Sequence, residues 1–296
     1  MGISDFEEMH RLAKVSRPDV CVITNIGTCH LENLGDRDGV FKAKTEMFDY
    51  ASKDCFVVLN GDDDKLSNVK EVNGHAPVFF GIDTDRDVMA IKYESLGIRG
   101  TKVKIKYFDK ELDTVIPIPG YHMIYNAMAA VCIGSHFGMT LDEIDSGIRN
   151  LKAIGGRNNI FTTNGITVID DCYNASFESV KNALSYINKK DGRKILILGD
   201  ILELGKRSKQ IHRKLGTLIS NCAYLITIGK WSKYISKEAR KNGLKKKYVK
   251  HFKNVSIAKK YILSIIKPND NVLIKASNAV NLSELVNYLK ESEIDN

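Results

Sequence analysis

The strongest constraint on the fold is an alternation of short apolar strands with helices in the second half of the chain. A short apolar run is typical of a strand that is buried on both faces, as in a parallel sheet. Strands that alternate with helices form right-handed crossovers and a doubly wound sheet. The pattern predicts an α/β domain with strands at 167–169, 194–198, 224–228 and 271–274 and with helices near 178–188, 207–221, 254–265 and 281–290.

The first half of the chain predicts a separate α/β unit. Residues 20–25 form an apolar run, and we expect a parallel strand that is buried on both faces. Residues 77–118 change to a period of two, which favours antiparallel hairpins exposed on one face. Glycine-rich residues 153–157 have the composition of a linker, so we expect domains at 1–152 and 153–296. The other expected elements of this unit include helices at 4–16, 36–50 and 140–151 and a strand at 56–60.

Composition is ordinary for a globular protein, with 43% apolar and 27% charged residues. No apolar run approaches the length of a membrane span, and the N-terminus lacks the pattern of a signal peptide. The six cysteines are scattered without Cys-x-x-Cys spacing, which favours reduced thiols over disulfides or a zinc site. We therefore predict a cytoplasmic protein without a membrane span.

The formal net charge of +8 allows more than one explanation. Much of the excess lies in residues 241–253, where Tyr248 and Phe252 interleave with lysines as in some nucleic-acid grooves. The same residues are equally typical of a short strand between solvated lysines. A basic surface also suits small anionic substrates. We predict that the protein does not bind nucleic acid.

A helix is predicted after Pro119-Gly120, and its small residues Ala127, Ala129 and Ala130 allow it to pack closely on a sheet. His122 and Asn126 are four residues apart, so they share one face near the helix N-terminus. Beside the free backbone N–H groups there, they form a candidate nucleotide contact. The alternative is that His122 caps the helix and Asn126 satisfies a neighbouring backbone group.

The segment Gly199–Ser208 lies between a predicted strand and a predicted helix, where a phosphate loop would lie. A phosphate loop needs four residues between its glycines and a Ser or Thr directly after the lysine. Five residues separate Gly199 from Gly205, and Arg207 occupies the hydroxyl position. We reject this segment as a phosphate loop, and no other segment of the sequence fits one.

Two further sets of polar residues follow predicted strands. A carboxylate at Asp170-Asp171 could accept hydrogen bonds from ribose hydroxyls, although such residues are also ordinary turn formers. His30 and Lys44 form the other set, and a structural role is the simpler explanation for both. A lysine that has reacted with carbon dioxide is a carbamate, whose oxygens suit Mg²⁺. This reaction needs a neutral and therefore partly desolvated Lys44.

The order of these motifs along the chain resembles the Mur ligases of peptidoglycan synthesis. The resemblance extends over essentially the whole sequence. It implies the remainder of a central ATP-binding domain at 1–152, followed by a Rossmann-like ligase domain at 153–296. The motifs are Thr24-Asn25…His30, Ala43-Lys44-x-Glu46, Asn60-x-Asp62-Asp63, Gly120-x-His122-x-x-x-Asn126, Gly156-Arg157 and Asp170-Asp171-x-Tyr173-Asn174.

Three later motifs resemble the branch of this family that adds D-Ala-D-Ala: Leu198–Gly205, His212-Arg213 and Lys275-x-Ser277. The resemblance implies that ATP phosphorylates the carboxylate of UDP-N-acetylmuramoyl-tripeptide and that the D-Ala-D-Ala amine attacks the acyl phosphate. It implies ATP and Mg²⁺ as cofactors and a role in cell-wall biogenesis. The alternatives are another Mur or folylpolyglutamate-type ligase, and a non-catalytic remnant that binds adenosine or the dipeptide.

The resemblance also implies roles for individual residues. Lys44 and His30 would be catalytic and would bind magnesium. The substrate would contact Asn25, Lys275 and Ser277. The nucleotide would contact Asn126 at adenine, Asp171 at ribose and Arg157 at the phosphates. His122, Tyr173 and Asn174 would also contact the nucleotide.

At its N-terminal end the sequence departs from the family in three ways. The uridine-binding domain and the Gly-Lys-Thr phosphate loop are absent, and Met1-Gly2 matches only the end of a family Glu-Met-Gly motif. We therefore expect an N-terminally truncated fragment that is inactive alone. A separate chain that carries the missing part is a partner that the resemblance leaves open.

Overall fold

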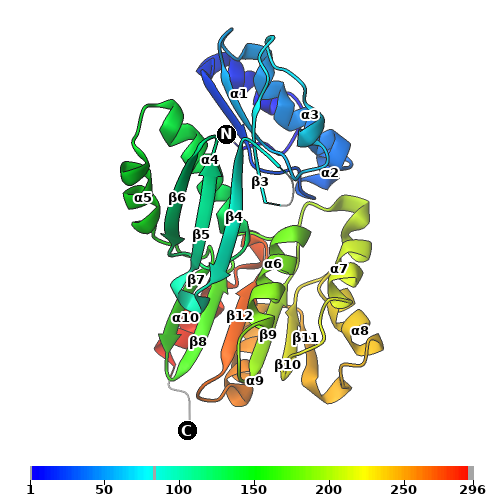
Figure 1. Ribbon diagram of the computed structural model, residues 1–296. Coiled ribbons are helices and arrows are strands. Elements are labelled where there is room, and N and C mark those ends of the chain that lie inside the picture. The colour runs from blue at the N-terminus through cyan, green and yellow to red at the C-terminus, as the bar shows by residue number, and fades with distance from the viewer. Residues whose placement is uncertain (1, 83–84, 293–296) are drawn as a thin grey trace. The chain divides into compact units, whose positions relative to one another are not determined.

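The structure is a computed structural model that describes residues 2–82 and 85–292. The chain divides into two compact units, Met1–Lys152 and Ala153–Asn296 (Figure 1). Each unit has its own six-stranded sheet and its own hydrophobic core. Among the described residues, no helix combines the length and the apolar character that crossing a bilayer requires.

The sheet of the first unit has the strand order β1-β2-β3-β4-β5-β6. β1 to β4 pair in parallel, and β4, β5 and β6 pair antiparallel. The strands are β1 (Val20–Ile23), β2 (Phe56–Asn60), β3 (Val78–Gly81), β4 (Val88–Ser95), β5 (Thr101–Tyr107) and β6 (Lys110–Ile116).

The prediction for residues 77–118 is confirmed for β4 to β6 and wrong for β3, which pairs in parallel with β2. The period of two is visible in β5, where Val103 and Ile105 are buried and Lys102 and Lys106 are exposed. The prediction for β1 was also wrong in part. Its residues are alternately buried and half-buried, so one face of β1 is only partly covered.

Five α-helices accompany this sheet among the described residues. α4 packs against β2 to β6, and its Ala127 and Ala129 are buried as predicted. The prediction was wrong for Ala130, which is exposed on the opposite side of the helix from the buried residues. The predicted helix at 36–50 is divided into α3 and a 3-10 turn, and α1 begins four residues later than predicted. The helices are α1 (Glu8–Ser16), α2 (Leu31–Leu34), α3 (Arg37–Thr45), α4 (His122–His136) and α5 (Leu141–Arg149), with 3-10 turns at Glu46–Tyr50, Leu66–Asn68 and Gly97–Arg99.

The second unit confirms the predicted doubly wound fold. Its strand order is β11-β10-β9-β12-β8-β7, and all neighbours are parallel except β7 and β8. The chain leaves β9 toward one edge and returns to β12 on the other side, so a topological switch point lies between β9 and β12. The strands are β7 (Asn159–Thr163), β8 (Ile166–Asp171), β9 (Lys194–Gly199), β10 (Tyr224–Ile228), β11 (Val249–Phe252) and β12 (Asn271–Lys275).

The helices of the second unit pack in two groups. α6, α7 and α8 pack in a row, and α9 packs with α10 against a core cluster beneath the sheet. The sequence analysis missed β7 and α8. The bounds are α6 (Phe177–Asn188), α7 (Ser208–Gly216), α8 (Lys233–Lys241), α9 (Val255–Ile265) and α10 (Ser283–Glu291), with 3-10 turns η4 (Gly205–Arg207), η5 (Lys246–Tyr248) and η6 (Asn278–Val280).

Candidate functional site

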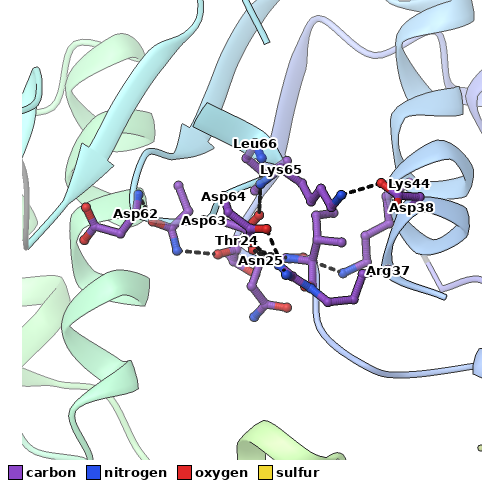
Figure 2. A network of polar contacts seen from close by, with 12 residues as sticks. Thr24, Asn25, Arg37, Asp38, Lys44, Asp62, Asp63, Asp64, Lys65 and Leu66 are labelled. Atoms are coloured by element: carbon purple, nitrogen blue, oxygen red, sulfur yellow. Dashed lines mark hydrogen bonds and ion pairs between the residues drawn. The ribbon is translucent and has the colours of Figure 1, made fainter. Parts of the chain in front are cut away.

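In the first unit, the loop after β1 is held by side chains of the loop after β2 (Figure 2). Asn60 Nδ2 donates to the carbonyl oxygen of Thr24 at 3.0 Å. The Ile26 N–H donates to Asp63 Oδ2 at 2.8 Å. These two contacts flank Asn25, so the carboxyl ends of β1 and β2 are joined on both sides of the candidate substrate-binding residue.

α3 holds the same three-residue segment from its other side (Figure 2). Arg37 Nε donates to the Ile26 carbonyl at 2.9 Å, and Lys44 Nζ donates to the Asn25 carbonyl at 2.8 Å. The Asn25 side chain is exposed. The backbone of the loop is therefore fixed by four side chains, while the Asn25 amide group faces solvent and can contact a ligand.

Asp63 is central to this network. It also accepts the N–H groups of Lys65 at 3.0 Å and Leu66 at 3.2 Å, so one carboxylate closes the turn after β2. Arg37 forms a bidentate ion pair with the exposed Asp64. Its guanidinium lowers the pKa of the Asp64 carboxyl. The Asn60-x-Asp62-Asp63 motif was part of the family resemblance, but the sequence indicated no role for its residues. The contact of Arg37 with this loop was not predicted.

His30 and Lys44 are both half-buried. His30 precedes α2 with a left-handed φ of 54°, a conformation that non-glycine residues rarely adopt. Among the described residues, no three His, Cys, Asp or Glu side chains gather in a way that could hold a metal ion. His30 and Lys44 therefore do not form a complete magnesium site by themselves.

α4 begins at His122, which is half-buried, and Asn126 is exposed one turn later. Asn126 Nδ2 lies 3.6 Å from the Met123 sulfur, a weak contact that leaves the amide available. The Tyr125 hydroxyl donates to Asp62 Oδ2 at 3.0 Å and ties this helix to the loop after β2. Sequence reasoning missed Tyr125, because nothing near it in the chain indicates Asp62 as its partner.

In the second unit, three predicted nucleotide-binding residues lie together. The Arg157 guanidinium is 4.0 Å from the centre of the Tyr173 ring, and both side chains are exposed. The Tyr173 N–H donates to the Gly156 carbonyl at 2.8 Å. The Asn158 N–H donates to Asp171 Oδ1 at 3.1 Å. Residues 156–158 and the loop after β8 are thus fixed to one another.

Lys275, at the end of β12, does not face solvent. Its side chain is 1% exposed, and its ammonium donates to Asp171 Oδ2 at 2.6 Å, the Asn174 carbonyl at 3.0 Å and the Asp171 carbonyl at 3.4 Å. A lysine ammonium has three N–H donors, so all of them are engaged. In this structure Lys275 therefore holds the loop that carries Asp171 and Asn174.

Ser277 is also buried and engaged. Its hydroxyl accepts the Leu202 N–H at 3.0 Å, and its own N–H donates to the Asp200 carbonyl at 3.0 Å. These contacts join the ends of β9 and β12 at the switch point. The contact of Ser277 with the incoming dipeptide or with the phosphate side of the site stays a prediction. In the structure its hydroxyl fixes the segment after β9.

Asp200 follows β9 and is 4% exposed. Its carboxylate accepts the N–H groups of Lys230 at 2.8 Å, Trp231 at 2.9 Å and Ser232 at 2.7 Å, just before α8. The segment rejected as a phosphate loop is thus a structural junction between strands. The sequence analysis gave Asp200 no role, although an acidic residue directly after an apolar strand was the available signal.

His212 supports the same segment from α7. Its Nε2 accepts the Ile201 N–H at 3.0 Å, so Nδ1 carries the proton and donates to the Ser208 carbonyl at 2.6 Å. Burial, the largest effect, lowers the pKa of His212 below its ordinary value. The folded protein therefore favours the neutral imidazole.

We expect this histidine to make folding stability depend on pH. Because its pKa is lower in the folded state, the unfolded chain binds the proton more readily, and stability falls as the pH drops below about 6.5. The loss has an upper limit of about 1.4 kcal/mol per pH unit. Urea unfolding at about pH 7.5 and about pH 5.5 measures the loss, which His212→Gln should reduce and the exposed control His75→Gln should not. An equal loss in His212→Gln would contradict the assignment.

The chain matches two family models, the Mur ligase middle domain at residues 1–134 and the Mur ligase, glutamate ligase domain at residues 156–278. It is 34% identical to the UDP-N-acetylmuramoyl-tripeptide–D-alanyl-D-alanine ligase of Bacillus subtilis, over 99% of this chain and 64% of that protein. The same ligase of Escherichia coli is 28% identical, with the same coverage. The chain thus spans about 64% of the length of these curated relatives.

Two solved structures are similar over the whole fold. MurF from Acinetobacter baumannii has a TM-score of 0.89 and 27% identity, over 99% of this chain and 64% of that one. MurF ligase from Thermotoga maritima, in complex with ADP, has a TM-score of 0.82 and 26% identity, over 98% of this chain and 66% of that one.

Proposed function

The chain belongs to the Mur ligase family, and from this premise we propose that it serves ATP-dependent amide-bond formation in peptidoglycan precursor synthesis. The proposed reaction joins D-Ala-D-Ala to UDP-N-acetylmuramoyl-tripeptide. The observation that carries the proposal is the 34% identity to the Bacillus subtilis ligase of that name, which extends over 99% of this chain. Because both substrates and ATP are metabolites of the cytoplasm, we propose the same compartment for this protein.

The proposed chemistry has two steps. A carboxylate oxygen of the tripeptide attacks the γ-phosphorus of ATP, which forms an acyl phosphate and releases ADP. The amine of D-Ala-D-Ala then attacks the acyl carbon, loses a proton, and expels phosphate. Both steps depend on positioned reactants and on neutralisation of negative charge.

We propose a set of nucleotide-binding residues within each unit. On α4, Asn126 and His122 contact adenine. In the second unit, Asp171 accepts the ribose hydroxyls, and Arg157 binds phosphate oxygens. The engaged ammonium of Lys275 supports the proposed role of Asp171. It holds Asp171 in place and leaves the Asp171 side chain 20% exposed. Tyr173 and Asn174 complete this part of the site.

The proposed reacting end lies in the first unit. Asn25 contacts the substrate from its fixed loop, and His30 and Lys44 act on the acyl phosphate. A magnesium ion bound with ATP would take most of its oxygen ligands from phosphate and water. His30 and a carbamate on Lys44 are the protein ligands that we propose, and the metal would neutralise phosphate charge. In these terms 1–152 is a central ATPase-type domain and 153–296 a Rossmann-like ligase domain.

The second candidate is a binding protein without turnover. It is favoured by one observation, the absence of a Gly-x-x-x-x-Gly-Lys-Ser/Thr segment from the 296 residues. Such a protein would retain adenosine or dipeptide binding through the residues above. The two candidates differ in whether the residues of the first unit support chemistry once a phosphate loop is supplied.

A fusion protein tests this difference. It joins the part of the Bacillus subtilis ligase that precedes the matched region to this chain. If Lys44 acts in the chemistry, Lys44→Ala should lower the ligation rate of the fusion by about 100-fold or more. A short carboxylic acid should restore part of the rate by filling the vacated oxygen position.

Lys42→Ala provides the matched control, because Lys42 is an exposed lysine on the same helix. Its rate should stay within about twofold of the parent fusion. Full activity of Lys44→Ala would remove Lys44 from the mechanism. An inactive parent fusion would instead favour the binding protein.

A further inference from the structure

The net charge of the chain is concentrated in one 24-residue segment, residues 230–253. This segment holds ten basic residues and one acidic residue, Glu238, which gives a formal charge of +9. The other 272 residues hold 34 basic and 35 acidic residues and are close to neutral. A strong asymmetry of this kind indicates a surface with its own partner rather than a general property of the protein.

The structure gathers part of this segment around a concave surface, which we call the basic groove. α8 buries Ile235 and Ala239 and turns its charged face outward. The chain then turns at Gly243, whose φ of 100° favours glycine, and continues to η5 and to β11 at the edge of the sheet. The groove has a volume of about 650 Å³ and is lined by Lys237, Arg240, Lys241, Gly243, Leu244, Lys245 and Lys246.

Most cations of the basic groove lack a counter-charge. Five of its seven lining residues are basic and none is acidic. The nearby Glu238 is already engaged, because its Oε2 lies 3.2 Å from Arg213 Nε and 3.8 Å from Lys241 Nζ. Within the described part of the chain, no carboxylate pairs with Arg240, Lys245 or Lys246. Their mutual repulsion would be relieved by an anionic ligand.

Two structural explanations account for only part of the charge. Lys250 is exposed on the edge strand β11, where a charged side chain hinders pairing with another sheet. Arg240 and Lys241 lie in the last turn of α8, where cations interact favourably with the helix dipole. Neither explanation applies to the other lysines of the groove, which precede β11 or lie in the middle of α8.

The surroundings distinguish among anionic partners. The segment contributes no large exposed apolar side chain that could enter a bilayer. Trp231 and Tyr234 are half-buried, with the ammonium groups of Lys230 and Lys233 5.0 and 5.3 Å from the centres of their rings. Aromatic faces occupied by lysines are poorly suited to stacking with bases. A flat bilayer or a wide duplex also fits a concave groove poorly, whereas a few residues of extended peptide match its volume.

We propose that the basic groove binds an acidic polypeptide segment of a partner protein. Carboxylates of the partner enter the groove and pair with Arg240, Lys245 and Lys246. Because these cations are solvent-exposed, the attraction accelerates encounter and weakens as salt screens it. This interaction is independent of the ligation chemistry.

The test uses the full chain and a fluorescein-labelled oligoglutamate peptide, with binding followed by fluorescence anisotropy. The wild type should bind the peptide at low salt and lose affinity as salt rises. The triple variant Arg240→Gln/Lys245→Gln/Lys246→Gln should bind about tenfold more weakly or worse, because it loses three ion pairs. The matched control Lys14→Gln/Arg99→Gln/Lys110→Gln removes the same charge from exposed sites of the first unit and should stay within about twofold of the wild type.

Three results would overturn the proposal. The first is equal affinity of the wild type and the groove variant for the peptide. The second is an equal loss in the groove variant and the control, which would make the effect one of net charge alone. The third is tighter binding to phosphatidylserine vesicles or to a short DNA duplex than to the peptide, which would assign the groove to a different class of partner.

Discussion

We expect the purified 296-residue chain to form no detectable amide product from ATP, D-Ala-D-Ala and UDP-N-acetylmuramoyl-tripeptide. A phosphate loop supplies several backbone N–H donors and a lysine to the transferring phosphoryl group, and this sequence contains no such segment. Removal of one such donor from an enzyme costs about 100-fold to 1,000-fold in rate. Loss of several should therefore lower the rate by about 10,000-fold or more.

The measurement is chromatographic detection of the ligated product together with release of phosphate. The fusion with the Bacillus subtilis segment, assayed at the same concentration, is the positive control for folded protein and competent substrates. Product formed by the chain alone and abolished by Lys44→Ala would contradict this expectation. Product that also forms in a mock preparation without this chain would point to a contaminating ligase.

The second large effect concerns the buried pair of Lys275 and Asp171. Asp171→Asn removes the carboxylate and leaves an ammonium group that is 1% exposed without a counter-charge. Breaking a buried pair in this way costs about 3–5 kcal/mol in the free energy of unfolding. Lys275→Met should cost less, because Asp171 is 20% exposed and water can solvate its carboxylate.

Urea unfolding of the single and double variants measures these free energies. The double variant Asp171→Asn/Lys275→Met should be more stable than Asp171→Asn alone, because the uncompensated charge is gone. The control is Asp145→Asn, which breaks the more exposed pair of Asp145 with Arg149 on α5 and should cost less than about 1 kcal/mol. Equal costs for Asp171→Asn and Asp145→Asn would show that the Lys275 ammonium is solvated in solution.

Features with a local cause could be predicted from the sequence. The strands Phe56–Asn60 and Tyr224–Ile228 have the predicted bounds, because an apolar run next to polar turn residues is a property of neighbouring residues. The same local patterns were sufficient for the doubly wound fold of the second unit. α8 was missed because few of its residues are apolar and buried. Ile235 and Ala239 are buried, but most of the residues around them are lysines or other polar residues. β7 was missed because its residues are half-buried or exposed.

The candidate site could be predicted only in part. The sequence indicated which polar residues follow strands, among them Asn25, Asp171 and Ser277, since strand ends are visible in the apolar pattern. The sequence could not indicate which of these polar side chains would be hydrogen-bonded within the protein and so be unavailable to a ligand. Lys275 is paired with a carboxylate 104 residues away, and Asn60 is bonded to a carbonyl 36 residues away. Such pairs depend on strand order and register.

The sequence alone therefore determined the class of fold, the motifs of the family and the excess charge of residues 230–253. Each of these depends only on neighbouring residues or on composition. The tertiary structure decided which side chains remain available to a ligand. Hydrogen-bond donors and acceptors that meet across the sheet satisfy one another, so Lys275 and Ser277 became supports, whereas Asn25 and Arg157 remained exposed. The basic groove likewise depends on tertiary structure, because it forms where α8 packs against the edge of the sheet.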